Sequence, residues 1–154
     1  MPDPEPKPRR GGIDYGLLPE LIGYQVRQAQ IAIFRDFTAS LADHGMTPTL
    51  FGSLVLIEAN PGLKQTDLAR ALQLDRATVV TVIDTLEARG LVARRRAIDD
   101  RRSNAVTLTA RGASTRAELT PRVAAHEARL VQELTEAERT TLAATLGRIF
   151  PDRR

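Results

Sequence analysis

Apolar side chains in the first third of the chain recur every three to four positions. One stripe consists of Leu18, Ile22, Val26, Ala29, Ile33, Phe37 and Leu41. Such spacing places residues on one face of a helix, and it predicts a helix over about residues 17–43. Pro19 falls in the first turn, where proline is tolerated. Gly45 follows as a C-cap.

Three further helices are predicted between residues 47 and 90. Thr47 and Pro48 are typical of a helix start, and the Asn-Pro-Gly sequence at 60–62 is typical of its end. A short helix at 65–72, a turn at 73–74 and a helix at 76–89 follow, with Asp75 as N-cap and Gly90 as the stop. Two short helices joined by a tight turn form a helix-turn-helix, which indicates DNA binding.

The second helix of this pair carries an apolar and a polar face. Its predicted core residues are Val79, Val80, Ile83 and Leu86. The candidates for contact with base edges in the major groove are Arg76, Ala77, Thr78, Thr81 and Thr85. These residues also suit an ordinary solvated helix face, so the pattern alone leaves both interpretations open.

The hydrophobic period changes from helical to alternating after Gly90. Strands over about 91–96 and 106–108 flank a charged turn at 97–103, which predicts a two-stranded ribbon beside the helix-turn-helix. Thr109 is expected to cap a long helix that Pro121 kinks or breaks. The Thr-Glu-Ala-Glu sequence at 135–138 predicts a capping box for the last helix. The predicted fold class is mainly α with a small β-wing, a winged helix-turn-helix flanked by N- and C-terminal helices.

The formal net charge of +3 is unevenly distributed. Residues 89–116 contain eight Arg and two Asp, which gives +6 in 28 residues. Arginines at a hairpin tip suit the narrow minor groove, whose potential is negative. A GC-rich genome explains the preference for Arg over Lys but not this clustering, so DNA binding is favoured over an unspecific basic surface. The candidates are Arg94, Arg95, Arg101 and Arg102, with Asp100 expected to position an arginine before binding.

The chain of 154 residues lacks the groups that most enzymes and metal sites need. It has no Cys, and its two His, His44 and His126, are far apart in sequence. We find no Gly-rich phosphate loop and no nucleophile–base pair, so we expect no enzyme, cofactor or metal. Residues 1–12 are rich in proline and charge, which predicts a disordered arm and no secretory signal. A cytoplasmic protein is expected.

Residues 100–112 read Asp-Arg-Arg-Ser-Asn-Ala-Val-Thr-Leu-Thr-Ala-Arg-Gly. This segment resembles the wing signature of the MarR (multiple antibiotic resistance regulator) family: Asp-x-Arg, three residues, then aliphatic-x-Leu-Thr-x-x-Gly. Residues 74–80 and 86–94 are similar to that family's recognition helix and first wing strand. The resemblance covers about residues 17–150. It implies winged-helix subunits that form a homodimer and bind a pseudo-palindromic operator, usually as a repressor.

The resemblance also implies roles for single residues. Asp100 and Arg102 occupy the positions of the Asp and Arg in the family's wing signature, and Arg101 lies beside them at the tip of the wing. Arg94 takes the strand position that buttresses the wing or touches phosphate.

On the recognition helix, Thr78 and Thr81 take exposed positions by the same resemblance. Val82 and Thr85 stand where many members carry Arg, which shifts binding toward the wing. The lack of Cys excludes the branch of the family that senses peroxides through thiols.

Four segments follow from these patterns: a disordered arm at 1–12, a dimerisation helix at 13–46, the DNA-binding domain at 47–112 and dimerisation helices at 113–154. A helix of about 27 residues is about 40 Å long, more than one winged-helix core covers. Its apolar stripes therefore need another surface. A second copy of the chain is the simplest source of that surface, which predicts a homodimer. The alternative is an intrachain helical bundle.

The resemblance further implies a small effector in a cleft between the dimerisation helices and the winged helix. Such ligands are commonly anionic aromatics, which need an aromatic wall and a cation. Tyr24, Arg27, Phe34 and Phe51 can supply these groups, although each also suits a core or surface role. Residues 23–30 are similar to members that govern aromatic-acid catabolism, so an aromatic acid or its CoA thioester is expected.

The predicted function is a ligand-responsive DNA-binding regulator of transcription. The alternative is a winged-helix module for protein contact without specific DNA binding. A steep loss of duplex affinity with salt distinguishes the two, because phosphate neutralisation releases counterions.

Overall fold

A computed structural model describes residues 9–10, 12–96 and 104–149 of the chain. The chain divides into two units, residues 1–36 and 37–154, which are described in turn. Helix α1 (Ile22–Ser40) begins in the first unit and ends in the second.

The first unit opens with a short antiparallel ladder. Strand β1 (Arg9–Arg10) pairs with β2 (Ile13–Asp14), within and just after the segment predicted as an arm. A 3-10 helix (Leu18–Glu20) then precedes α1. Leu21 between them has extended backbone angles, φ −84° and ψ 122°. The prediction of one helix starting near residue 17 is therefore wrong, because an extended residue interrupts the helical hydrogen bonds.

The second unit opens with the turn between α1 and α2. A 3-10 helix (Ala42–His44) ends at Gly45, whose φ of +55° lies in the left-handed region that favours glycine. Helix α2 (Pro48–Ala59) follows, and the Thr47 hydroxyl accepts a hydrogen bond of 3.3 Å from the Leu50 N–H. The predicted caps at Gly45 and Thr47 are confirmed.

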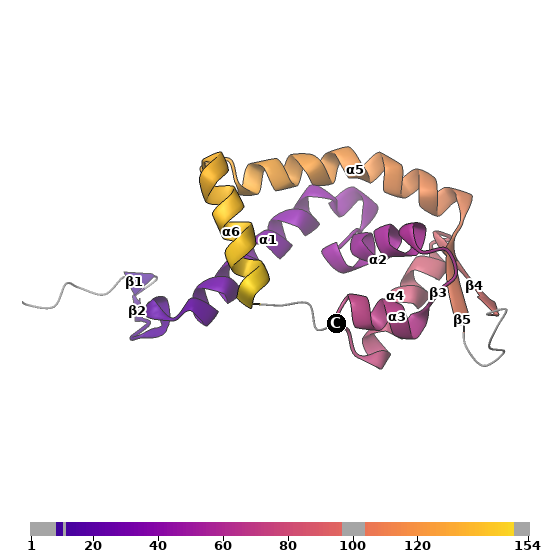
Figure 1. The fold of residues 1–154 in the computed structure, drawn as a ribbon, viewed down its shortest axis with the longest axis horizontal. Coiled ribbons are helices and arrows are strands. Elements are labelled where there is room, and N and C mark those ends of the chain that lie inside the picture. Colours follow the sequence, from indigo (N-terminus) through magenta and orange to yellow (C-terminus); the bar gives the residue numbers. More distant parts are fainter. Residues whose placement is uncertain (1–8, 11, 97–103, 150–154) are drawn as a thin grey trace, which may run out of the picture. The chain divides into compact units, whose positions relative to one another are not determined.

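The helix-turn-helix and its sheet follow α2 along the chain and lie together (Figure 1). The elements are β3 (Leu63–Lys64), α3 (Gln65–Ala71), α4 (Arg76–Ala88), β4 (Val92–Arg96) and β5 (Asn104–Leu108). The antiparallel sheet has the order β3-β5-β4, with Leu63 opposite Val106. The sequence predicted two strands and missed β3, because a two-residue strand has no alternating pattern of its own.

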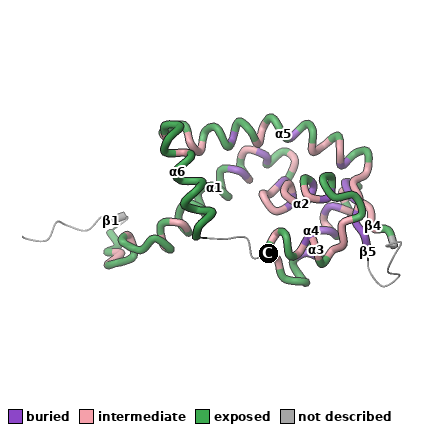
Figure 2. Tube along the Cα trace, in the orientation of Figure 1, coloured by how far each residue is buried: buried purple, intermediate pink, exposed green. Residues whose placement is uncertain are grey.

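The core lies among α2, α4, β5 and α5, where Figure 2 shows buried positions along each element. Leu54, Ile83, Val106 and Leu119 are completely buried. The sequence prediction for α4 needs one correction: Val80 is 37% exposed, and Val82 is 8% exposed and takes its place in the core. The helix buries its four core residues at i, i+3, i+4 and i+7, starting from Val79.

Two helices complete the unit. Helix α5 (Ala110–Leu130) continues through Pro121, so of the predicted kink or break the break is wrong (Figure 1). A proline removes one backbone donor, and α5 stays intact while Leu119 and His126 are buried on either side of it. Helix α6 (Glu136–Ile149) begins with the predicted capping box. The Thr135 N–H donates to Glu138 Oε2 at 2.8 Å and the Glu138 N–H donates to Thr135 Oγ1 at 3.3 Å. The predicted class, mainly α with a small β-wing, is confirmed.

Candidate nucleic-acid interface

The turn between α3 and α4 fixes where α4 begins. Gln73 has a φ of +53°, a left-handed conformation that few non-glycine residues adopt. The Leu74 N–H donates to the Ala69 carbonyl at 2.9 Å, which closes the turn predicted at residues 73–74. The two helices therefore form a helix-turn-helix with a tight connection.

Asp75 caps α4 as predicted. Its Oδ1 accepts a hydrogen bond of 2.8 Å from the Thr78 N–H, and its Oδ2 accepts one of 2.7 Å from the Thr78 hydroxyl. These two bonds, the backbone one first, lower the pKa of Asp75 below its usual value. The start of α4 is thus held by an ionised carboxylate, which also suits the positive end of the helix dipole.

The candidate contact residues of α4 fall on its solvent side. Arg76, Ala77, Thr78 and Thr81 are exposed, and Thr85 is half-buried. Val80 is exposed with them, although the sequence placed it in the core. The surface that α4 offers to a groove is therefore more apolar than the sequence prediction held.

Arg94 connects the wing to α4. The guanidinium on β4 forms ion pairs with Asp84 and Glu87 of α4, and the Arg94 N–H donates to Glu87 Oε1 at 3.1 Å. Burial acts against its charge, but the hydrogen bonds that its guanidinium donates to Asp84 and Glu87 raise the pKa of Arg94 above its ordinary value. Sequence reasoning missed these two partners; their signal is a pair of acids three positions apart on α4, ahead of an arginine on the next strand.

The base of the wing is closely packed. The Thr109 hydroxyl donates to the Gly90 carbonyl at 2.7 Å and accepts from the Gly112 N–H at 2.9 Å. A Cβ on Gly112 would lie 1.9 Å from the carbonyl oxygen of Leu91, which no side chain tolerates. Packing thus explains why a glycine follows Leu-Thr-x-x at this place.

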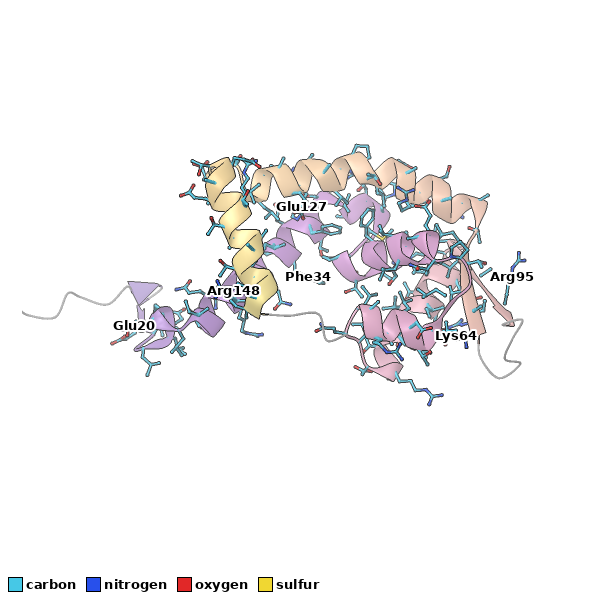
Figure 3. All side chains as sticks on the ribbon, viewed as in Figure 1. Glu20, Phe34, Lys64, Arg95, Glu127 and Arg148 are labelled. Carbon is cyan, nitrogen blue, oxygen red and sulfur yellow. The ribbon has the colours of Figure 1, made fainter. Side chains whose placement is uncertain are left out.

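The outer wing carries further candidate residues. Arg95 is exposed on β4 and extends away from the sheet (Figure 3). Asp100, Arg101 and Arg102 lie outside the described residues. The structure thus places Arg94 against α4 and Arg95 in solvent on β4, and it leaves the tip residues as predictions.

The four effector candidates lie in different units. Tyr24, Arg27 and Phe34 belong to the part of α1 in the first unit, where the Tyr24 ring lies 6.4 Å from that of Tyr15. Phe34 is 42% exposed and lines an open hollow of about 400 Å³ with Gln30, Ile31 and Arg35. Phe51 belongs to the second unit, and its ring lies 6.2 Å from that of the core residue Phe37.

Two other kinds of site were sought. Over residues 9–10, 12–96 and 104–149, no group of three or more His, Asp or Glu side chains is arranged to hold a metal ion. Within the same ranges, no helix has the length and apolar content that crossing a bilayer requires.

Comparison with known proteins identifies close relatives. The sequence model of the MarR family matches residues 46–103. A protein of Thauera aromatica, assigned as a transcriptional regulatory protein for the hcr operon, is 35% identical over 88% of this chain and 82% of its own. The transcriptional repressor CouR bound to a 23-mer DNA duplex is 40% identical, with a TM-score of 0.83, and the match covers 89% of this chain and 97% of CouR.

A second CouR structure, bound to p-coumaroyl-CoA, is 38% identical with a TM-score of 0.84. It covers 91% of this chain and 99% of that one. Both matches extend well beyond the segment that the family model covers, to most of the chain.

Proposed function

Because this chain belongs to the MarR family of winged-helix transcription regulators, we propose that it is a repressor that binds a pseudo-palindromic operator as a homodimer. The main support is the rigid connection between α4 and the basic wing through Arg94. Through Arg94, helix α4, which is of a size to fit the major groove, lies next to the positively charged wing, so both can contact one duplex. The proposed DNA-binding domain is 47–112.

Helix α4 and the wing have separate roles in the proposal. The exposed residues of α4, Arg76, Thr78 and Thr81, with Thr85 at the edge, contact base edges in the major groove. Arg95 contacts phosphate. Arg101 and Arg102 enter the minor groove, with Asp100 restraining an arginine before binding.

The homodimer is supported by apolar surface outside the DNA-binding domain. Leu142 and Ile149 on α6 are 45% and 46% exposed, and Ile22 at the start of α1 is 69% exposed. Removing such side chains from water favours association. A second copy that covers residues 13–46 and 113–154 places two wings about one DNA turn apart.

The effector is proposed to be an aromatic acid or its CoA thioester. The support is the likeness to CouR, whose structure contains p-coumaroyl-CoA, together with the aromatic and cationic groups of α1. Tyr24 and Phe34 of the first unit are assigned to the ring, and Arg27 of the same unit to the acid or phosphate groups. Effector binding releases the protein from DNA in the cytoplasm.

Binding to duplex DNA tests the proposal. Fluorescence anisotropy on a site selected from a random duplex library, repeated from 50 to 200 mM salt, is expected to show an affinity that falls steeply with salt. Addition of p-coumaroyl-CoA or a free aromatic acid is expected to release the DNA. A protein that binds no duplex, or whose binding is insensitive to salt, is instead a module for protein contact.

A further inference from the structure

The threonine hydroxyls on α4 all donate hydrogen bonds within the protein. The Thr78 hydroxyl donates to Asp75 Oδ2 at 2.7 Å. The Thr81 hydroxyl donates to the Ala77 carbonyl at 3.2 Å, and the Thr85 hydroxyl donates to the Thr81 carbonyl at 2.8 Å. Threonines in helices commonly bond to the preceding turn in this way. The three hydroxyl protons are therefore already in hydrogen bonds within the protein and are not offered to a ligand.

What these residues still offer to a partner is methyl groups and oxygen lone pairs. Thr81 and Ala77 are both exposed and lie one helical turn apart, and Val80, which is 37% exposed, lies three positions after Ala77 on the same turn. We name these three residues the methyl face. Asp84 follows on the same side of α4, but its carboxylate is paired with Arg94.

Each base pair presents its own set of donors, acceptors and methyl groups in the major groove, so a protein face contacts some base pairs better than others. Guanine presents two acceptors, N7 and O6, which require donors from the protein. Thymine presents its C5 methyl, which requires apolar contact. Adenine and cytosine present amino groups, which a hydroxyl lone pair can accept. A face of methyls and acceptors therefore matches thymine and the adenine paired with it, and it does not match guanine.

We infer that the methyl face of α4 recognises thymine methyl groups in the major groove, so that the operator has A·T pairs at the positions that this face contacts. This inference rests on the proposed function and names the bases that Ala77, Val80 and Thr81 select. The Arg94 ion pairs hold the methyl face beside the basic wing, so the occupant must be polyanionic and also offer methyl groups. Duplex DNA has both, whereas RNA lacks the thymine methyl and has a major groove too narrow for side chains.

Replacing thymine by deoxyuridine tests the inference. The site selected from a random duplex library is synthesised again with deoxyuridine at each thymine in turn, which removes only the methyl. The minor groove is unchanged, so contacts of the wing are preserved. We expect an affinity loss of about fourfold at each contacted thymine, the equivalent of about 0.8 kcal/mol for one buried methyl.

Two variants assign the effect to its residue. Thr81→Ser removes the methyl, and the penalty is expected to vanish at one position of each half-site. Thr81→Val is the matched control, because it keeps a methyl and removes the hydroxyl, so the deoxyuridine penalty is expected to persist.

The outcomes separate this inference from the proposed function. Equal affinity for thymine and deoxyuridine duplexes, at any salt, overturns the methyl face and leaves the repressor proposal standing. A loss of the A·T preference in Thr81→Val overturns it as well, because the hydroxyl would then be the reader. Binding to no duplex of either kind overturns the proposed function and this inference with it.

Discussion

The Arg122 guanidinium donates two hydrogen bonds of 2.8 Å to the two carboxylate oxygens of Asp43, 79 positions earlier in the chain. The same guanidinium donates to the Ser40 carbonyl at 2.6 Å. Through these bonds α5 holds the turn between α1 and α2. Paired hydrogen bonds of this kind fix orientation as well as distance, so the turn at residues 40–43 has a defined position against α5 within the second unit.

The first prediction concerns the pH dependence of this contact. The Arg122 hydrogen bonds are the main cause that lowers the pKa of Asp43 below its ordinary 3.8. A carboxyl with a lowered pKa in the folded state stabilises the protein above the unfolded pKa, and the contribution is lost as pH falls through the folded value. In Asp43→Asn the contribution is absent. The gap in urea midpoint between wild type and Asp43→Asn is therefore expected to narrow as pH falls from 6 to 3.

Urea unfolding followed by circular dichroism at each pH measures this gap. Asp67→Asn provides a control, since Asp67 is paired only locally with Arg70 at 3.0 Å and no contact between distant elements depends on that pair. A gap for Asp43→Asn that stays constant or widens toward low pH contradicts the role given to the pair.

The second prediction concerns Gly112. An alanine there places Cβ 1.9 Å from the Leu91 carbonyl oxygen and 2.9 Å from its carbon. A shift of the Leu91 backbone away from this Cβ would break a hydrogen bond, because the Leu91 carbonyl also accepts one of 3.1 Å from the Thr109 N–H. Gly112→Ala is expected to lower the free energy of unfolding by about 3 kcal/mol, the upper end of overpacking costs.

Chemical denaturation measures the loss, and Gly52→Ala in α2 is the matched control. A Cβ on Gly52 meets only Leu72 Cδ2, at an ordinary 3.6 Å. Replacing glycine by alanine inside a helix stabilises by about 0.5–1 kcal/mol. If both variants have the same stability, the close approach at Gly112 does not limit the fold.

Local patterns were predictable from sequence, and long-range contacts were not. The caps at Thr47, Asp75, Thr109 and Thr135 depend on hydrogen bonds to residues three positions later, so the sequence contains both partners. The third strand was missed because β3 forms only when β5 provides a partner.

In the candidate site, too, the features of a single element were predictable from sequence, and the contacts between elements were not. The residue types of α4 and the charge of the wing were visible in the sequence. The burial of Val82 instead of Val80 depends on the rotation of α4 against α2 and β4, which one helix cannot reveal. The pairing of Arg94 with Asp84 and Glu87 joins a strand to a helix, so the spacing of the two acids becomes informative only once the packing of β4 against α4 is known.

The third prediction concerns the wing tip. Arg102→Ala is expected to weaken operator binding by roughly 1–3 kcal/mol, and Arg101→Ala by somewhat less. The reason is that a guanidinium in the narrow minor groove meets a strongly negative potential. Anisotropy titrations at one fixed salt concentration measure the change. Unchanged affinity in both wing variants rules out minor-groove binding by the wing.

The fourth prediction separates the two roles open to Arg94. If its ion pairs with Asp84 and Glu87 position the wing, Arg94→Gln lowers duplex affinity but leaves the dependence of log K on log salt unchanged, because no phosphate contact is lost. Arg95 is exposed on the same strand, and Arg95→Gln is expected to reduce the slope by about 0.9, the value for one phosphate. Titrations of both variants from 50 to 200 mM salt give the two slopes. A reduced slope in Arg94→Gln assigns Arg94 to phosphate, and its ion pairs on α4 then break when DNA binds.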